Sequence, residues 1–327
     1  MKHSRFQIPD SRLAGILAAC LLAAAGCSEE KGSGLGKDFS YDLTELRKVE
    51  PHLIGYDEAG TISVPLKEVR GLAVDAKDRV FVAGDDVVAV FDREGKREAE
   101  IKAGSASRCL AVAADGTLYV GMKDHVEAYS LKGDRKVVWE SLGEKALITS
   151  IVVGEGGVFV ADAGNRVVVR YDLAGKQLGL IGRKDEARDI PGFVVPSPHL
   201  DLAVGRDGLL WVVNPGRHKL QAFTADGDLE ASWGKASAGI EGFSGCCNPT
   251  DIAVLPDGRF VTAEKGIPRV KVYSAEGVFE CVVAAPDRFG KDAVGLDLAV
   301  DSLGRVLVLD PQAKKVRVFV RRKRMDG

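Results

Sequence analysis

A β-strand unit that recurs six times is the feature that most restricts the fold of this 327-residue chain. The first copy begins at Gly71 and reads GLAVDAKDRVFVAGDDVVAVFDREGK, and successive copies start 38 to 51 residues apart. Repeats of this length are typical of propeller blades. In each copy, alternating apolar residues flank turns such as Asp115-Gly116, and Asp-Gly favours tight hairpins because these turns need positive φ. The pattern predicts an all-β, six-bladed β-propeller.

The two ends of the repeat region indicate how the ring closes. The last copy, from about Gly295 to Arg321, supplies only three strands, whereas a propeller blade has four. Ahead of the first copy, Leu53-Ile54-Gly55 matches Leu180-Ile181-Gly182, where the fourth strand of blade three is expected. We therefore expect the N-terminal strand to complete the last blade and to cover its open edge. An unrelated N-terminal arm is the alternative.

The N-terminal segment is typical of a secretory signal. Basic residues precede the apolar stretch 13–25, which is too short for a mature membrane-spanning helix. Hydrophobicity then ends at Cys27, which resembles the lipid-modified cysteine of bacterial lipoproteins. Cys20 is an alternative lipidation site, and ordinary signal-peptidase cleavage is another possibility. The sequence predicts a lipoprotein signal peptide at 1–26, a flexible tether at 27–38, a propeller at 39–322 and a basic tail at 323–327.

This leader sets the expected location and partners. We expect an exported, membrane-anchored lipoprotein, either periplasmic or on the cell surface. The formal net charge of −2 becomes about −4 once residues 1–26 are removed, which argues against a nucleic-acid partner. The expected partners are a protein or small ligand at the propeller face, and the membrane through the lipid anchor.

A column of carboxylates is the first candidate site. Aligning the copies places Asp201, Asp251 and Asp297 where the innermost strands of three consecutive blades begin. His199 and Asn248 lie close to the same entrance. Carboxylates gathered at a narrow channel repel one another, and a bound Ca²⁺, a cationic ligand or raised pKa values would relieve this repulsion. The alternative is that each aspartate accepts backbone N–H groups where its own strand begins.

Adjacent cysteines form the second candidate site. Cys246 and Cys247 lie in the segment Phe243-Ser244-Gly245-Cys246-Cys247-Asn248-Pro249, just ahead of a predicted inner strand. Paired thiols in an exported protein predict a vicinal disulfide or a soft-metal site, for example for Cu(I). Pairing of either residue with Cys281 or Cys109 is the remaining alternative.

The repeats resemble the NHL-repeat family of β-propellers. The family pattern is clearest at Ala161-Asp162-Ala163-Gly164-Asn165-Arg166-Val167, and the resemblance extends from about residue 50 to 321. It implies the propeller fold but no single activity, since the family includes interaction modules and a few metal-dependent enzymes. We expect a binding or scaffold module of the cell envelope. A metal-dependent hydrolase or lyase that uses the carboxylates, and a thiol-based soft-metal or redox protein, are the alternatives.

Overall fold

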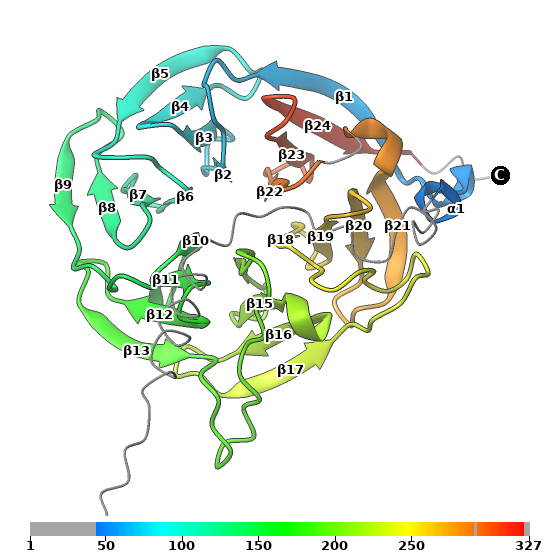
Figure 1. The fold of residues 1–327 in the computed structure, drawn as a ribbon. Helices are drawn as coiled ribbons and strands as arrows, with labels where there is room; N and C mark the ends of the chain where they lie inside the picture. Colours follow the sequence, from blue (N-terminus) through cyan, green and yellow to red (C-terminus); the bar gives the residue numbers. More distant parts are fainter. Residues whose placement is uncertain (1–43, 291–292, 324–327) are drawn as a thin grey trace, which may run out of the picture. The chain divides into compact units, whose positions relative to one another are not determined.

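The computed structural model describes residues 44–290 and 293–323, and these form a ring of six four-stranded antiparallel sheets (Figure 1). The predicted signal peptide, the tether and residues 324–327 of the basic tail lie outside the described residues. The six-bladed β-propeller predicted from the repeats is confirmed. The described residues contain only one short α-helix, α1 (Thr44–Arg47), with the 3-10 turns η2 (Pro51–Leu53), η3 (Pro215–Arg217) and η4 (Pro286–Arg288).

In blades one to five, four consecutive strands form a meander, and the first of them in the chain lies nearest the axis of the ring. Blades one and two contain β2 (Gly71–Val74), β3 (Val80–Gly84), β4 (Val87–Phe91), β5 (Arg97–Lys102), β6 (Cys109–Val112), β7 (Leu118–Gly121), β8 (Val126–Tyr129) and β9 (Arg135–Val138). Blades three and four contain β10 (Ile148–Gly154), β11 (Gly157–Asp162), β12 (Val167–Tyr171), β13 (Gln177–Ile181), β14 (Leu202–Val204), β15 (Leu210–Asn214), β16 (Lys219–Phe223) and β17 (Leu229–Trp233). Blade five contains β18 (Asp251–Val254), β19 (Phe260–Glu264), β20 (Arg269–Tyr273) and β21 (Phe279–Ala284).

Blade six combines strands from the two ends of the described chain. Its order is β1 (Tyr56–Ser63), β24 (Lys315–Arg321), β23 (Val306–Asp310) and β22 (Asp297–Val300). Strand β1 pairs with β24 along its length, from Tyr56 opposite Arg321 to Ser63 opposite Lys315. Leu53-Ile54-Gly55 precedes this strand, and Ile54 instead forms a bridge with Val282 of β21. The sequence match therefore lies next to the strand and not within it.

The hydrophobic core lies between neighbouring blades. Each of six buried clusters combines residues from two adjacent sheets, and one cluster packs Ile62 of β1 against Leu72 of β2 and Leu307 of β23. A four-stranded sheet cannot bury both faces alone, so stacking around the ring supplies the missing partner. Every blade carries a buried aromatic residue at or near the end of the strand that is third from the axis: Phe91, Tyr129, Tyr171, Phe223, Tyr273 and Phe319.

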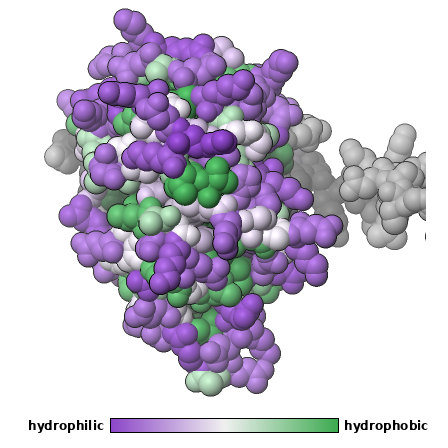
Figure 2. Space-filling view, turned by 90° about the vertical axis from the view of Figure 1, so that its left-hand side faces the viewer, coloured by the Kyte–Doolittle hydropathy of each residue, from purple (hydrophilic) through white to green (hydrophobic). Residues whose placement is uncertain are grey.

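The outer strands are largely polar. Figure 2 shows the side of the ring where β9 lies, and hydrophilic residues dominate it, with small and separate apolar patches. Val137 and Val138 of β9 are among the exposed apolar side chains, at 38% and 48% exposure. No helix among residues 44–290 and 293–323 is long and apolar enough to cross a membrane. This side of the ring therefore offers no large apolar face.

Candidate binding site at the channel mouth

The three predicted aspartates lie together at the entrance of the central channel. Asp251 and Asp297 begin β18 and β22, and Asp201 directly precedes β14. All three border a cavity of about 280 Å³ that opens at this end of the ring. Asp201 and Asp297 also border a second cavity, of about 310 Å³, lined mainly by aliphatic residues of the inner strands. The carboxylates therefore stand between the mouth and the channel below it.

The aspartates link successive blades to one another. Each carboxylate accepts a hydrogen bond from a backbone N–H of the next blade around the ring. The bonds run from Ile252 N to Asp201 Oδ2 (2.8 Å), from Leu298 N to Asp251 Oδ1 (2.9 Å) and from Leu72 N to Asp297 Oδ2 (2.6 Å). Asp297 also accepts from Leu298 N of its own strand, at 2.8 Å. Asp201 likewise interacts with the N–H of Leu202, so Asp201 and Asp297 bond both at their own strand entry and across a blade boundary.

The three carboxyl groups also share protons. Burial raises the pKa of Asp201 to about 6, although hydrogen bonds from Ser150 and two backbone N–H groups favour its charged form. Burial and the charge of Asp201 raise the pKa of Asp297 to about 8. Burial and the charges of both neighbours raise the pKa of Asp251 well above its ordinary value, and Asp251 forms side-chain hydrogen bonds with each of them. At neutral pH, Asp251 and Asp297 are therefore both largely protonated and Asp201 is largely charged, and Asp251 donates to its two neighbours.

Two guanidinium groups, which the sequence interpretation missed, line the opposite side of the mouth. Arg70 and Arg108 come directly before the first residues of β2 and β6. In the aligned repeats they occupy the position just before the aspartate column, and a comparison of that position could have identified them. Arg108 Nε donates to Ile148 O at 3.2 Å, and burial together with the charge of Arg70 lowers the pKa of Arg108. Arg70 forms an ion pair with Glu68, and an anionic group bound between the two arginines would relieve the repulsion that remains.

His199 lies in the same cavity wall, as predicted from its position near Asp201. Burial and the positive charge of Lys265 lower the pKa of His199 to about 4, so the imidazole is neutral at physiological pH. A neutral imidazole can both donate and accept a hydrogen bond. The mouth thus combines carboxylates on blades four to six, guanidinium groups on blades one and two, and a neutral histidine.

Asn248 has a different place from the one expected. Its side chain donates to Ser244 O (2.6 Å) and Lys265 O (3.0 Å) and accepts from Lys265 N (2.9 Å). Asn248 is only 1% exposed and is not among the residues that line the mouth. The residue therefore holds the loop ahead of β18 in place. Within the described part of the chain, no three His, Cys, Asp or Glu side chains come together as a set of metal ligands.

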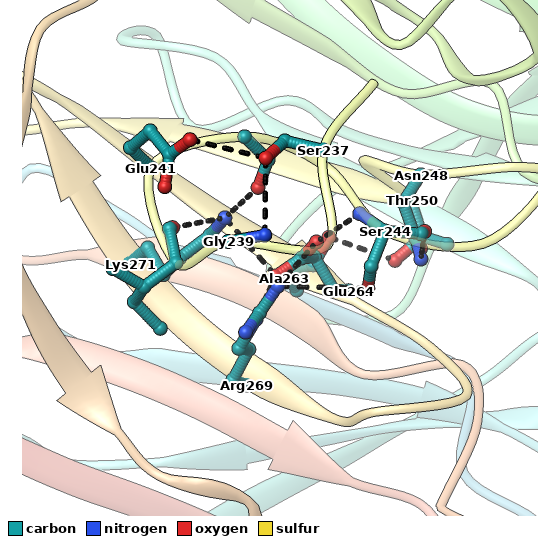
Figure 3. A network of polar contacts seen from close by, with 12 residues as sticks. Ser237, Gly239, Glu241, Ser244, Asn248, Thr250, Ala263, Glu264, Arg269 and Lys271 are labelled. Carbon is teal, nitrogen blue, oxygen red and sulfur yellow. Dashed lines mark hydrogen bonds and ion pairs between the residues drawn. The ribbon is translucent and has the colours of Figure 1, made fainter. Parts of the chain in front are cut away.

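The loop that carries Cys246 and Cys247 rests on a buried network of charges (Figure 3). Glu264 forms ion pairs with Arg269 and with Lys271, the latter at 3.1 Å, and all three side chains are almost completely buried. Lys271 Nζ donates to Ile240 O (3.1 Å) and Gly242 O (2.6 Å). Burial lowers the pKa of Lys271 to about 8 despite the nearby Glu264. The network ties the segment between β17 and β18 to the hairpin of β19 and β20.

Comparisons with known proteins support the fold and leave the activity open. No family model matches the chain, and no curated protein matches it in sequence. Among solved structures, a virginiamycin B lyase from Staphylococcus aureus is similar with a TM-score of 0.57 at 12% identity, over 80% of this chain and 98% of that one. A streptogramin B lyase gives a TM-score of 0.55 at 11% identity, over 84% and 100%. The WD40 β-propeller domain of Doa1 gives 0.55 at 15%, over 82% and 98%. At these identities the likeness shows the propeller fold alone.

Proposed function

We propose that this chain is an exported, lipid-anchored propeller of the NHL type that binds a small zwitterionic ligand in the mouth of its channel. The observation that carries the proposal is the separation of charge across the 280 Å³ cavity, with Arg70 and Arg108 facing the carboxyl set. A cavity of this size suits a ligand of few atoms. Guanidinium groups bind carboxylate or phosphate oxygens, and carboxylates bind an ammonium group.

The proposed export rests on the leader, in which an apolar stretch of signal-peptide length ends at Cys27. An envelope location suits a binding module, because such a protein meets small external solutes or neighbouring envelope proteins. Propellers commonly bind ligands at the face where the inner strands begin, and the cavity lies at that face.

Binding measurements with matched ligands test the proposal. Isothermal titration should give tighter binding for small amino acids or short peptides than for the same molecules with either charge blocked. Arg108→Gln should weaken binding about tenfold to a hundredfold, since a hydrogen bond to a charged group contributes about 1.5–3 kcal/mol. Arg97→Gln, on the exposed outer strand β5, is the matched control and should change nothing. Equal affinity of Arg108→Gln and the unmodified chain, or of blocked and unblocked ligands, contradicts the proposal.

A lyase or hydrolase is the second candidate, favoured by the unequal pKa values within the carboxyl set. Asp201, with a pKa of about 6, can accept a proton at neutral pH, while Asp251 retains one and can donate it. Such a pair is what general acid–base catalysis requires. Two of the similar solved structures are lyases for virginiamycin B or streptogramin B.

Incubation with virginiamycin B, followed by chromatography, tests this candidate directly. Turnover that Asp251→Asn abolishes favours the enzyme, and a stable protein that leaves the compound unchanged argues against this activity. A parallel reaction with chelator and with added Ca²⁺ distinguishes a metal-dependent form. A rise in melting temperature with micromolar to millimolar Ca²⁺ would independently report cation binding.

A further inference from the structure

The adjacent cysteines are the reactive groups that the proposed binding site does not use. Cys246 and Cys247 lie five and four residues ahead of Asp251, and their sulfur atoms are 3.2 Å apart. Cys246 is exposed, whereas Cys247 is 4% exposed. No disulfide joins them or the other described cysteines: Cys109 is buried between blades two and three, and Cys281 packs against Gly55. One sulfur of the pair is thus reachable from solvent, and the second lies directly behind it.

The surrounding loop holds the pair in this position. Asn248, the residue after the pair, is held to Ser244 and Lys265 by three hydrogen bonds. Ser244, two residues before the pair, donates through its backbone N–H to Glu264 Oε1 at 3.1 Å, which ties the chain there to the buried charge network (Figure 3). Both ends of the short cysteine segment are therefore anchored in the blade. Anchored ends lower the entropy that a reaction between the two sulfurs must overcome.

The polar groups around Cys247 favour its thiolate. The Ser197 hydroxyl is buried with no hydrogen-bond partner among the described residues, so it is available to donate to a Cys247 thiolate. Burial opposes ionisation of Cys247, but hydrogen bonds from Ser197, Cys246 and Lys265, with the charge of Lys265, lower its pKa below the ordinary value. The interaction with Cys247 raises the pKa of Cys246. Cys247 therefore loses its proton more readily than an ordinary thiol and more readily than Cys246, and a cation lies beside the pair.

We propose that Cys246 and Cys247 form a thiol–disulfide exchange site on the loop ahead of β18. Its substrate class is an external disulfide, either of a small thiol compound or of another envelope protein. The two sulfurs are already in contact, and the described residues offer no third ligand that a metal site would add. These observations favour exchange over binding of a soft metal.

The exchange balances in two steps. In the reactive form Cys247 is the thiolate; it takes the proton of Cys246, and the resulting Cys246 thiolate attacks one sulfur of the external disulfide R–S–S–R, forming a mixed disulfide and releasing RS⁻. The Cys247 thiol gives its proton to this RS⁻, and its thiolate attacks Cys246, forming the Cys246–Cys247 bond and releasing a second RS⁻, which takes a proton from water. The protein loses two electrons, and the external disulfide gains them as two RSH molecules.

Peptide mapping of the full-length chain tests the proposal with oxidised glutathione as the external disulfide. The reduced, folded protein is incubated with this probe, quenched with acid and alkylated. We expect the peptide that contains both cysteines to be two hydrogens lighter and unalkylated. Cys247→Ser should accumulate a glutathione adduct at Cys246, because the resolving thiol is missing. Cys246→Ser should react poorly, because Cys247 is buried. Cys281→Ser is the matched control and should still form the Cys246–Cys247 bond.

Substitution of Lys265 distinguishes a reactive cysteine pair from a purely structural one, because only a reactive pair should change its rate of adduct formation. Lys265→Met should slow adduct formation in the Cys247→Ser background by roughly threefold or more, since loss of the cation raises the thiol pKa, and Lys265→Arg should restore the rate. A bond from either cysteine to Cys281 or Cys109 overturns the proposal. So does oxidation seen only in unfolded protein, or purified protein that retains copper and resists glutathione until the metal is removed.

Discussion

Replacement of Asp251 by asparagine isolates the proton that we assign to the carboxyl set. In the folded chain, Asp251 Oδ1 accepts the N–H of Leu298, and the side chain also bonds to Asp201 and Asp297. An asparagine can keep the acceptor through its own Oδ1 and present N–H donors to the two neighbours. The substitution therefore preserves shape and hydrogen bonds, but it cannot release a proton as pH rises.

The expected magnitude follows from the direction of the pKa shift. Asp251 has a pKa well above 3.8 in the folded chain and near that value when unfolded, so the native state binds the extra proton. Stability is therefore lost as pH rises from the unfolded pKa toward the folded one. Each extra native proton lowers the free energy of unfolding by about 1.4 kcal/mol per pH unit. Between pH 6 and 8 the unmodified chain should lose at most about 3 kcal/mol from this carboxyl, and Asp251→Asn should lose none of it.

Urea unfolding at pH 6, 7 and 8 measures this difference directly. For a chain of this size, about 3 kcal/mol corresponds to roughly 6 °C in melting temperature, so thermal scans give a second reading. Contributions from His199 and Lys271 occur in both proteins and cancel in the comparison. Asp226→Asn, an exposed carboxylate paired with Arg170, is the control and should follow the unmodified chain. Parallel stability curves for Asp251→Asn and the unmodified chain would refute the assignment of the proton.

Three further predictions concern the anchor, the ring closure and the buried charges. Cys27→Ala should release the exported protein from the membrane fraction or stall its processing, whereas Cys20→Ala should not; the reverse result on immunoblots would move the lipidation site. Deletion of residues 39–64 removes the strand paired with β24 and should lower the free energy of unfolding by several kcal/mol and promote aggregation; an unchanged melting temperature would contradict this. Glu264→Gln should cost about 3–5 kcal/mol in urea unfolding, because Lys271 would be left buried without its partner; a cost below about 1 kcal/mol would show that the backbone carbonyls suffice.

The fold could be predicted from the sequence because its determinants are local and repeated. Each copy carries its own alternation and its own hairpin turns, and Gly116 and Gly258 do adopt the positive φ expected there, at 83° and 90°. The position of β1 was harder to place, since the resemblance of Leu53-Ile54-Gly55 to another blade identified the neighbourhood and missed the strand itself. The strand is defined by its pairing with β24, more than 250 residues away in the chain. No local sequence pattern indicates which residues pair across such a separation.

The candidate site could be predicted only in part. The alignment of Asp201, Asp251 and Asp297 indicated a shared location, because equivalent positions in repeated blades form a ring around the axis. Their hydrogen-bond partners depend on how each blade is rotated against the next, which the sequence of one blade does not contain. The donor to Asp251 is the N–H of Leu298, 47 residues away. Asn248 was assigned to the mouth from its proximity along the chain, but its amide points into the loop that it stabilises.

The buried charge network beneath the cysteine loop could not be predicted from the sequence either, but its contacts indicate what it does. Glu264, Arg269 and Lys271 belong to a hairpin of charged and apolar residues that could equally face solvent, and they are buried because the segment between β17 and β18 folds over them. Well-packed apolar residues would often stabilise such a position as much as a buried ion pair. Apolar side chains would not, however, select one position for the loop, whereas Lys271 bonds two of its carbonyl groups and Glu264 bonds Ser244 N. We infer that the charges position the segment that ends in Cys246 and Cys247, as the proposed exchange between these thiols requires.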